Sequence, residues 1–472
     1  MHAADLYFTP ATELAVLIRR RALSPVDLME AVIARAEQLN PTLNAICTPT
    51  YDCALEQAKQ AEAALMRGDP LGPLHGIPVT IKDLAFTRGV RTMGGSFLFR
   101  DRIPSIDHVH VERLQAAGAI SIGKTTVSEL GWKGNSDSPV TGVTHNPWKH
   151  GMNAGGSSGG AAVCAAAGIG PLHQGSDGAG SVRMPAAFCG VFGMKPSFGR
   201  VPYHPMPNNG SISHIGPLTR TVADAALMMR VLAGPDDRDA SSLEAAPADY
   251  LGELERGVNS LRVAYSPDLG YLRVDDEVAL VVKGAVEVFE QFGCHVEEVD
   301  PTRVLGWGDP IEMEHCLFAS GYAGMLGQVL ERWADRMDPG LVALTRHGLS
   351  YSAADYCRAQ GERLAYYDRV IALFSRYDLL LTPTLSVAAF PVDRLIPAHW
   401  PQHRWDWLRW AGFSYPFNLT GLPAATVPCG FTAEHLPVGL QIVAGRFQDL
   451  RVLQAARALE QARPWADHRP PL

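Results

Sequence analysis

The feature that most constrains this chain is a run rich in glycine, alanine and serine from residue 155 to residue 200, GGSSGGAAVCAAAGIGPLHQGSDGAGSVRMPAAFCGVFGMKPSFGR. Serines lie inside glycine clusters twice in this run, at Ser157 and at Ser181. Glycine permits positive φ and lets the backbone approach a neighbouring group closely. Turns of this composition expose a hydroxyl together with several peptide N–H groups. The run therefore predicts tight packing around two serine-bearing turns.

Outside this run, the chain alternates short β-branched stretches with amphipathic helices. Ser24 is an N-cap candidate before Pro25, and it predicts a helix that opens the chain. GIPVTIKDL predicts a strand at 77–81 that ends on Lys82. The same signals predict a strand at 119–123 after a helix ending near Gly118, helices at 158–167, 221–234 and 276–292, and strands at 261–265, 295–299, 379–381, 424–427 and 438–443. Between the helix at 158–167 and segment 182–189 we expect a short extended stretch and a sharp turn.

Strands spread over nearly the whole length and interleaved with helices predict an α/β fold. We expect a single large twisted mixed β-sheet covered by helices on both faces. One domain would span residues 1–472, with an N-terminal helical segment at about 1–70, a core at about 71–235 and a C-terminal part at about 260–472. The acidic stretch 236–259 between the last two parts is interpreted as a surface excursion.

Composition excludes several classes of function. A hydrophobic share of 47% lets 472 residues bury a large core, and a net charge of −8 gives no basic footprint for nucleic acid. No apolar run reaches the roughly 20 residues that a membrane-spanning helix needs, and the N-terminus has no signal-peptide pattern. We expect a cytoplasmic protein that binds neither nucleic acid nor membrane.

Cysteine and histidine patterns indicate no metal site. The eight cysteines are scattered without CxxC pairs, so they are interpreted as reduced core thiols. His108 and His110 lie two residues apart, as ligands on a strand do, but their flanks favour a helix and no third ligand lies at a recognisable offset.

The serine turns suit acyl transfer. A serine hydroxyl needs a base to become a nucleophile, and no G-x-S-x-G elbow is present. The N–H groups of Gly178, Ala179 and Gly180 precede Ser181 and are candidates for an oxyanion hole. Lys82 is a candidate base if burial lowers its pKa, although a lysine at a strand end is more often a surface charge. GGSSGG lacks the Lys-Ser/Thr pair of a phosphate loop.

A resemblance to a known family sharpens these candidates. GIPVTIKD, GGSSGG, GSDGAGSVRMPAAFCGVFGMKPSFGRVP, NLTGLPAATVPCGF and LPVGLQIVA together resemble the amidase signature family over almost the whole chain. The resemblance implies the fold of the amidase signature family and its Ser-cisSer-Lys triad. In this chain Ser181 would be the nucleophile, Ser157 the bridging serine across a cis peptide, and Lys82 the base. The resemblance implies no cofactor and no metal.

The neighbours of the triad have supporting roles in this interpretation. Asp177 and Arg183 flank the nucleophile and would hold its turn, with a surface ion pair as the alternative. Ser158 would cap the following helix, and the glycines of GGSSGG would give the backbone slack. Ala179 stands where most members of the family have a second glycine, and it still donates its N–H if its φ is negative. We therefore expect activity to survive this change.

Two features bear on the substrate. The glutamine-hydrolysing A subunit of a tRNA-dependent amidotransferase shares the triad, but its glutamine pocket uses an acid where this chain has Ala411. Four tryptophans, Trp400, Trp405, Trp407 and Trp410, precede the Asn-Leu motif and suit either an apolar pocket wall or ordinary packing.

We therefore expect a serine hydrolase, monomeric or homodimeric, that cleaves small neutral amides, aryl or hydrophobic in character. Esters and carbamates (urethanes) follow the same acyl-enzyme route, so the sequence does not rank the three bonds. The alternative within the family is the glutamine-hydrolysing amidotransferase component described above. A scaffold without activity is disfavoured because Lys82, Ser157 and Ser181 are all present.

Overall fold

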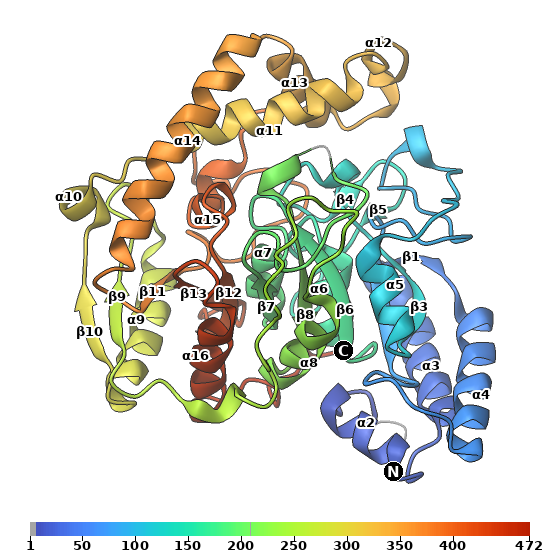
Figure 1. The fold of residues 1–472 in the computed structure, drawn as a ribbon. Coiled ribbons are helices and arrows are strands. Elements are labelled where there is room, and N and C mark those ends of the chain that lie inside the picture. The colour runs from blue at the N-terminus through green and yellow to red at the C-terminus, as the bar shows by residue number, and fades with distance from the viewer. Residues whose placement is uncertain (1–5, 208) are drawn as a thin grey trace.

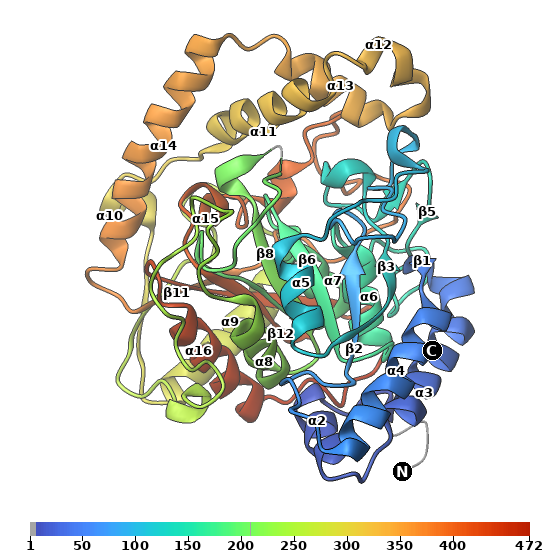
Figure 2. The same cartoon turned by 45° about the vertical axis from the view of Figure 1, so that its right-hand side comes forward.

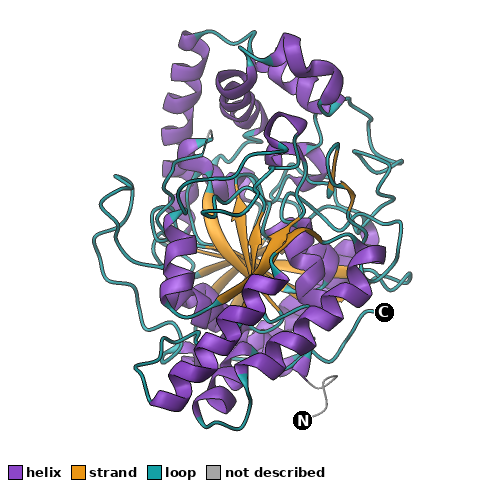
Figure 3. Ribbon diagram, turned by 90° about the vertical axis from the view of Figure 1, so that its right-hand side faces the viewer, coloured by secondary structure: helices purple, strands orange, loops and turns teal. Residues whose placement is uncertain are grey.

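A computed structural model of the chain describes residues 6–207 and 209–472. Within these residues, eleven strands form one mixed sheet in the order β1-β3-β2-β6-β8-β7-β12-β13-β11-β9-β10, and helices cover both of its faces (Figures 1 and 3). The strands are β1 (Ile46–Pro49), β2 (Pro78–Lys82), β3 (Ile120–Thr125), β6 (Leu172–Asp177), β7 (Phe192–Lys195), β8 (His214–Thr219), β9 (Arg262–Tyr265), β10 (His295–Glu298), β11 (Leu379–Pro383), β12 (Ala424–Phe431) and β13 (Pro437–Ala444). β4 (Asp137–Ser138) and β5 (Gly142–Val143) form a separate small hairpin. The predicted α/β sheet with helices on both faces is confirmed.

The helices alternate with these strands along most of the chain. They are α2 (Ala11–Arg19), α3 (Pro25–Leu43), α4 (Tyr51–Arg67), α5 (Val109–Ala116), α6 (Gly159–Ala167), α7 (Arg183–Cys189), α8 (Val222–Leu232), α9 (Asp276–Gln291), α10 (Pro301–Leu305), α11 (Ile311–Leu326), α12 (Leu330–Trp333), α13 (Pro339–Gly348), α14 (Ala353–Leu373), α15 (Pro416–Leu419) and α16 (Asp449–Ala462). No helix in the described ranges is both long and apolar enough to cross a membrane.

Local sequence signals account for most of these boundaries. The Ser24 hydroxyl accepts hydrogen bonds from the N–H groups of Val26 and Asp27 and so caps α3 as predicted. The expectation that this helix opens the chain is wrong, because α2 precedes it with Pro10 at its N-cap. The Thr221 hydroxyl caps α8 by accepting from the Asp224 N–H. Each predicted strand overlaps an observed one, and the largest difference is at β12, which ends four residues beyond the predicted 424–427.

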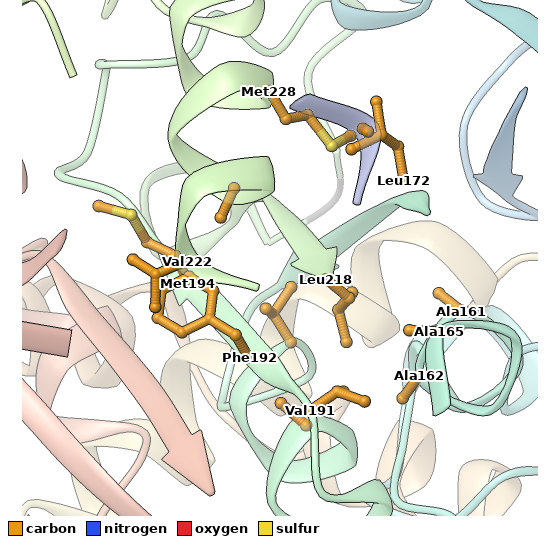
Figure 4. Packing of buried hydrophobic residues seen from close by; sticks show 14 of the residues in the cluster. Ala161, Ala162, Ala165, Leu172, Val191, Phe192, Met194, Leu218, Val222 and Met228 are labelled. Atoms are coloured by element: carbon orange, nitrogen blue, oxygen red, sulfur yellow. The ribbon is translucent and has the colours of Figure 1, made fainter. Parts of the chain in front are cut away.

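The sheet combines parallel strands around β2 with an antiparallel centre. β2 pairs in parallel with both β3 and β6, whereas β8, β7, β12 and β13 form an antiparallel centre. Around this centre, alanines of α6 pack with side chains of β6, β7, β8 and α8 (Figure 4). Small residues let α6 lie close to the sheet. This packing fixes the two turns at the ends of α6 and β6.

A second apolar cluster lies under the C-terminal helices. α11, α13 and α14 form a layer beyond the edge of the sheet, and α12 lies beside them (Figures 1 and 2). Met184 and Phe188 of α7 belong to the same buried cluster.

The cysteines and the histidine pair differ in part from expectation. All eight cysteines are free, but Cys53 and Cys357 are exposed, so the description of core thiols is wrong for these two. His110 lies in α5 with His108 at its N-cap, as the flanking residues predicted. Both imidazole rings are buried against the Tyr203 ring.

Candidate active site

The carboxyl ends of two neighbouring parallel strands bring the candidate residues together. β2 ends on Lys82 and β6 ends on Asp177. Carboxyl ends of parallel strands meet at the same edge of a sheet. Ser157 lies in the turn before α6, and Ser181 lies in the turn between β6 and α7. The two turns are in contact, because the Ser158 N–H donates to the Ser181 carbonyl at 3.2 Å.

The Lys82 amine lies among uncharged hydrogen-bond partners. Nζ donates to the Ser157 Oγ at 2.8 Å, to the Ser158 Oγ at 2.8 Å and to the Ser176 carbonyl at 3.1 Å. The side chain is only 1% exposed. Lys82 is therefore a buried amine to which no carboxylate of the described residues is bound, and the alternative of a surface lysine is wrong.

This environment makes Lys82 a base at neutral pH. Burial lowers its pKa to about 7, and the negative charge of Asp177 opposes only part of that change. An ordinary lysine titrates near pH 10.4. A large fraction of Lys82 is consequently unprotonated at pH 7, which is the form that accepts a proton.

The backbone at Ser157 is held by close packing. The Gly156–Ser157 peptide bond is cis, as the family resemblance implies. A Cβ on Gly156 would lie 2.2 Å from the Asn135 carbonyl oxygen, and a Cβ on Gly155 would lie 2.5 Å from the Pro185 Cα. The expectation that these glycines make the backbone loose is therefore wrong. Glycine is needed at both positions because neighbouring backbone lies directly against them.

Ser158 has a different role from the one predicted. It occupies the N-cap position of α6, but its side chain makes no capping hydrogen bond. Its hydroxyl instead accepts from the Lys82 Nζ and donates to the Ser176 carbonyl at 3.2 Å. The hydroxyl binds the amine, and not the N–H groups at the start of α6, because the amine and the hydroxyl are buried side by side. Ser158 thus orients the lysine rather than the helix.

Asp177 and Arg183 form a completely buried pair that holds the Ser181 turn. The carboxylate of Asp177 accepts from the N–H groups of Gly180 at 2.7 Å and Val182 at 3.1 Å. It also accepts from the Arg183 Nε and Nη2, both at 3.0 Å, and both side chains are 0% exposed. The alternative of a surface ion pair is wrong. Burial alone would raise the pKa of Asp177, but Arg183 holds it well below its usual range.

Three residues that sequence reasoning did not single out complete this network. The Asn418 Nδ2 donates to the Asp177 carboxylate at 2.9 Å and to its carbonyl at 3.0 Å. The Arg183 Nη1 donates to the Ser414 carbonyl and to the Gln441 Oε1. Asn418 opens the NLTGLP segment, where a polar residue precedes an apolar strand. That context is the one signal that points to it.

The turn before Ser181 supplies peptide N–H groups, but not all those predicted. The Gly180 N–H donates to Asp177 and is therefore occupied. Within the part of the chain that the structure describes, the N–H groups of Gly178, Ala179 and Ser181 donate to no protein acceptor. Ala179 has no positive φ, so its methyl group is accommodated. The candidate oxyanion donors are thus Gly178, Ala179 and Ser181, and Gly180 is removed from the predicted set.

Gly180 itself is required by geometry. Its φ is 111°, a conformation that L side chains rarely adopt. A Cβ there would lie 2.5 Å from the Ser414 Oγ, which donates to the Ala179 carbonyl. The two adjacent positions in the turn therefore differ. There is room for the methyl group of Ala179, but a methyl group at Gly180 would clash.

A cavity of about 550 Å³ lies between α11, α14 and the short 3-10 helix Gly210–Ile212. Its lining combines apolar and polar side chains, including Ile212, Leu317, Ser320, Met325, Gln360 and Arg363. The Asn418 Nδ2 donates to the Ile212 carbonyl at 3.1 Å as well as to Asp177. The cavity wall is thus tied to the nucleophile turn, although Ser181 itself, 6% exposed, does not line the cavity.

The four tryptophans are all buried and serve packing. The Trp407 Nε1 donates to the Trp132 carbonyl at 2.9 Å, and the Trp410 ring stacks on Phe188. A Cβ on Gly134 would lie 2.7 Å from the Trp410 ring. None of the four lines the cavity described above. The rings support segment 132–135, whose Asn135 carbonyl lies against the backbone at Ser157.

Ala411 offers no charge to a substrate. It is 0% exposed, and its carbonyl accepts a hydrogen bond from the Ser414 Oγ at 2.8 Å. Residues 411–418 contain no carboxylate, so this segment has no partner for a substrate ammonium group.

Known proteins resemble the chain over its whole length. The family model described as "Amidase" matches residues 27–453. An acylamidase of Rhodococcus erythropolis is 40% identical, with all of this chain and 98% of the relative covered. The A subunit of the glutamyl-tRNA(Gln) amidotransferase of Moorella thermoacetica is 34% identical, with 99% of each covered.

Solved structures agree with this similarity. A bacterial aryl acylamidase of the amidase signature enzymes superposes with a TM-score of 0.90 at 31% identity, with 97% of each chain covered. A 6-aminohexanoate cyclic dimer hydrolase superposes with a TM-score of 0.89 at 27% identity, with 98% of this chain and 99% of that chain covered. By the extent of these matches, the chain belongs to the amidase signature family and is an amide hydrolase.

Proposed function

We propose that the enzyme hydrolyses small neutral amides of aryl or hydrophobic character through an acyl-enzyme on Ser181. The observation that supports this most directly is the buried Lys82 amine, which is hydrogen-bonded to the Ser157 hydroxyl and has no charged group bound to it in residues 6–207 and 209–472. A base in this state is what a serine nucleophile needs where no histidine serves it.

In the first step of this mechanism, Ser181 attacks the carbonyl carbon of the amide. Its proton passes to the Ser157 hydroxyl while Ser157 passes its own proton to unprotonated Lys82. The carbonyl electron pair moves to the oxygen, and the unoccupied N–H groups of Gly178, Ala179 and Ser181 stabilise that oxyanion. Asp177 and Arg183 keep these groups in place.

Breakdown of the tetrahedral intermediate reverses the proton path. The C–N bond breaks, Ser157 donates a proton to the leaving nitrogen, and Lys82 returns its proton to Ser157. An acyl ester on Ser181 and a free amine result. Water then attacks the ester by the same relay and releases a carboxylic acid. Each step uses residues of this chain, and the route serves esters and carbamates equally.

The cavity lining and segment 411–418 support the proposed substrate class. Ile212, Leu317 and Met325 give the cavity an apolar share, and segment 411–418 has no acid to bind an ammonium group. The named activities of the acylamidase and aryl acylamidase relatives favour the same class. The alternative, the glutamine-hydrolysing component of a tRNA-dependent amidotransferase, is favoured by the 34% identity to such proteins, and it requires an ammonium partner elsewhere.

We further propose that the enzyme works in the cytoplasm as a monomer or homodimer. All eight cysteines are free thiols, two of them exposed, and free thiols persist in a reducing compartment.

Product release from a substrate panel tests the function. The panel contains 4-nitroacetanilide, a 4-nitrophenyl ester, an aryl carbamate and free glutamine. We expect release of 4-nitroaniline and no ammonia from glutamine. Ser181→Ala is expected to lower every rate by at least about a thousandfold while the fold is retained, because the nucleophile is lost.

Ser375→Ala, an exposed serine at the end of α14, is the matched control and should keep the wild-type rates. Ammonia release from glutamine without any aryl turnover would instead identify a component of an amidotransferase. Residual activity of more than a few per cent in Ser181→Ala would refute the nucleophile assignment.

A further inference from the structure

A buried carboxyl group on α11 has no hydrogen-bond partner. Glu314 is 0% exposed, and within the described residues neither Oε1 nor Oε2 is hydrogen-bonded. A buried polar group without a partner is costly, and native structures contain few of them. Glu314 is not needed for the relay described above, so its burial calls for a separate explanation.

Glu314 belongs to the helix face that borders the cavity. Leu317, Gly321 and Gly324 line the cavity, and Glu314 precedes Leu317 by three residues, which places it on the same face one turn earlier in α11. Arg363 of α14 lines the cavity and interacts electrostatically with Glu314. Glu314 itself does not line the cavity and lies one helical turn from its wall.

The charged groups around Glu314 come from three elements. Arg363 on α14 favours the carboxylate, whereas Asp177 at the end of β6 disfavours it, and Tyr415 beside α15 is a further titratable neighbour. The guanidinium of Arg363 is already engaged with the Leu419 carbonyl and with Ser211.

Burial decides the protonation state of Glu314. Desolvation raises its pKa to about 8, against the smaller opposing effect of Arg363. At pH 7 most of the population is the neutral acid, whose O–H is a hydrogen-bond donor. A neutral donor without an acceptor is complementary to an acceptor oxygen on a ligand.

We propose that Glu314 is a specificity-determining residue whose protonated carboxyl donates a hydrogen bond to an acceptor oxygen on the part of the substrate that fills the cavity. The inference rests on the proposed function and narrows its substrate class to neutral amides with a second acceptor oxygen, such as the next carbonyl of an oligoamide. Glu314 is buried and does not line the cavity in this structure, so the proposed contact requires its side chain to rotate toward Leu317 and Arg363, which do.

Ligand binding to the inactive Ser181→Ala protein tests the inference without turnover. Two matched pairs differ only in a carbonyl replaced by a methylene: levulinic anilide with pentanoic anilide, and para-acetylacetanilide with para-ethylacetanilide. The first pair places the acceptor in the acyl half and the second in the amine half. Isothermal titration calorimetry gives the ratio of the two Kd values in each pair.

We expect the carbonyl member of one pair to bind about tenfold more tightly, as a single hydrogen bond between buried groups provides. In the Ser181→Ala background, Glu314→Gln should keep this ratio because its amide is also a donor, whereas Glu314→Met should bring it to about one. A mere effect on folding would weaken both members of a pair equally, so the ratio is diagnostic.

The pH dependence gives a second readout. As pH rises through about 8, Glu314 loses its proton and the preference for the carbonyl member should disappear. The Glu314→Gln protein should keep its preference across the same range. Equal Kd values in both pairs, or a preference lost as fully in Glu314→Gln as in Glu314→Met, would overturn the inference. Aryl turnover is measured separately, so failure of the proposed function is distinguishable from failure of this one.

Discussion

Two buried basic side chains, Lys82 at the end of β2 and Arg183 at the start of α7, have opposite surroundings. Arg183 contacts the Asp177 carboxylate at 3.0 Å and also donates to Ser414 and Gln441. Lys82 donates to hydroxyl and carbonyl groups. Arg183 is therefore paired, whereas among the described residues Lys82 has no counter-ion in contact.

The difference separates two tasks. A paired and hydrogen-bonded charge keeps its ionisation state and fixes the backbone around it, which here is the Ser181 turn. An unpaired buried amine is destabilised when protonated, so its pKa falls into the neutral range. Rigid positioning and proton transfer are therefore assigned to different basic side chains.

The sharpest test of this comparison removes the unpaired cation. Lys82→Met should lower kcat/KM for an anilide at least about a thousandfold, because the base is lost. Its midpoint in urea unfolding should not fall, because an apolar side chain replaces a buried amine that has no counter-ion. A midpoint well below wild type would show that Lys82 stabilises the fold and would break the comparison.

Replacing Arg183 should destabilise the fold, whereas replacing Lys82 should not. Arg183→Met leaves the Asp177 carboxylate buried and unpaired, so we expect a loss of about 3–5 kcal/mol in the free energy of unfolding. Urea unfolding monitored by circular dichroism measures it. The matched control is Arg238→Met, where the ion pair with Glu112 is on the surface, and its effect should stay within about 0.5 kcal/mol. Equal effects at the two sites would contradict the assigned structural role.

The pH profile sharpens the assignment of the base. Only unprotonated Lys82 accepts a proton, so kcat/KM should rise about tenfold per pH unit below about 7 and level off above it. The free energy of unfolding should also increase with pH. The pKa of Lys82 is about 7 in the folded state and 10.5 ordinarily, so the unfolded chain binds more protons between these values and stability rises with pH there. A rate independent of pH between 6 and 9 would exclude Lys82 as the base.

The smallest effect is expected inside the turn that the paired cation holds. Ala179→Gly should change kcat/KM by less than about threefold, because Ala179 already has a φ that both residues adopt. The matched variant Gly180→Ala places a methyl group against Ser414 at a φ of 111° and should abolish most activity. Steady-state rates on one anilide compare the two, and similar losses in both would contradict the geometry of the turn.

Much of the fold was predictable because local signals and tertiary packing agree. β-branched runs ending on Lys82 and in segment 438–443 lie in strands, and the Ser24 cap starts α3. The opening helix was missed because Pro10 at its N-cap provides no side-chain cap. Clear caps located α3 and α8, but α14 was not predicted although Ser352 and Asp355 form a capping box at its start.

The site was predictable as far as its serines, its lysine and the Asp177–Arg183 pair that holds the Ser181 turn. That Ser158 binds Lys82 and does not cap α6 depends on how close the end of β2 comes to α6, which no local pattern encodes. The same holds for the Gly180 N–H, because Asp177 claims it only once the turn has folded. Asn418 lies more than two hundred residues from Asp177 in sequence, so its contact depends wholly on the topology of the sheet.

The layer of α11 and α14 has a consequence for how this enzyme can be redesigned. These two helices contribute Leu317, Met325 and Gln360 to the cavity, while the proposed relay uses only residues 82 to 181. A mutant library restricted to the two helices would sample new selectivities without touching the hydrolytic machinery. The residues that line the cavity and the residues of the proposed relay thus lie in different segments of the chain, so each set can be mutated without changing the other.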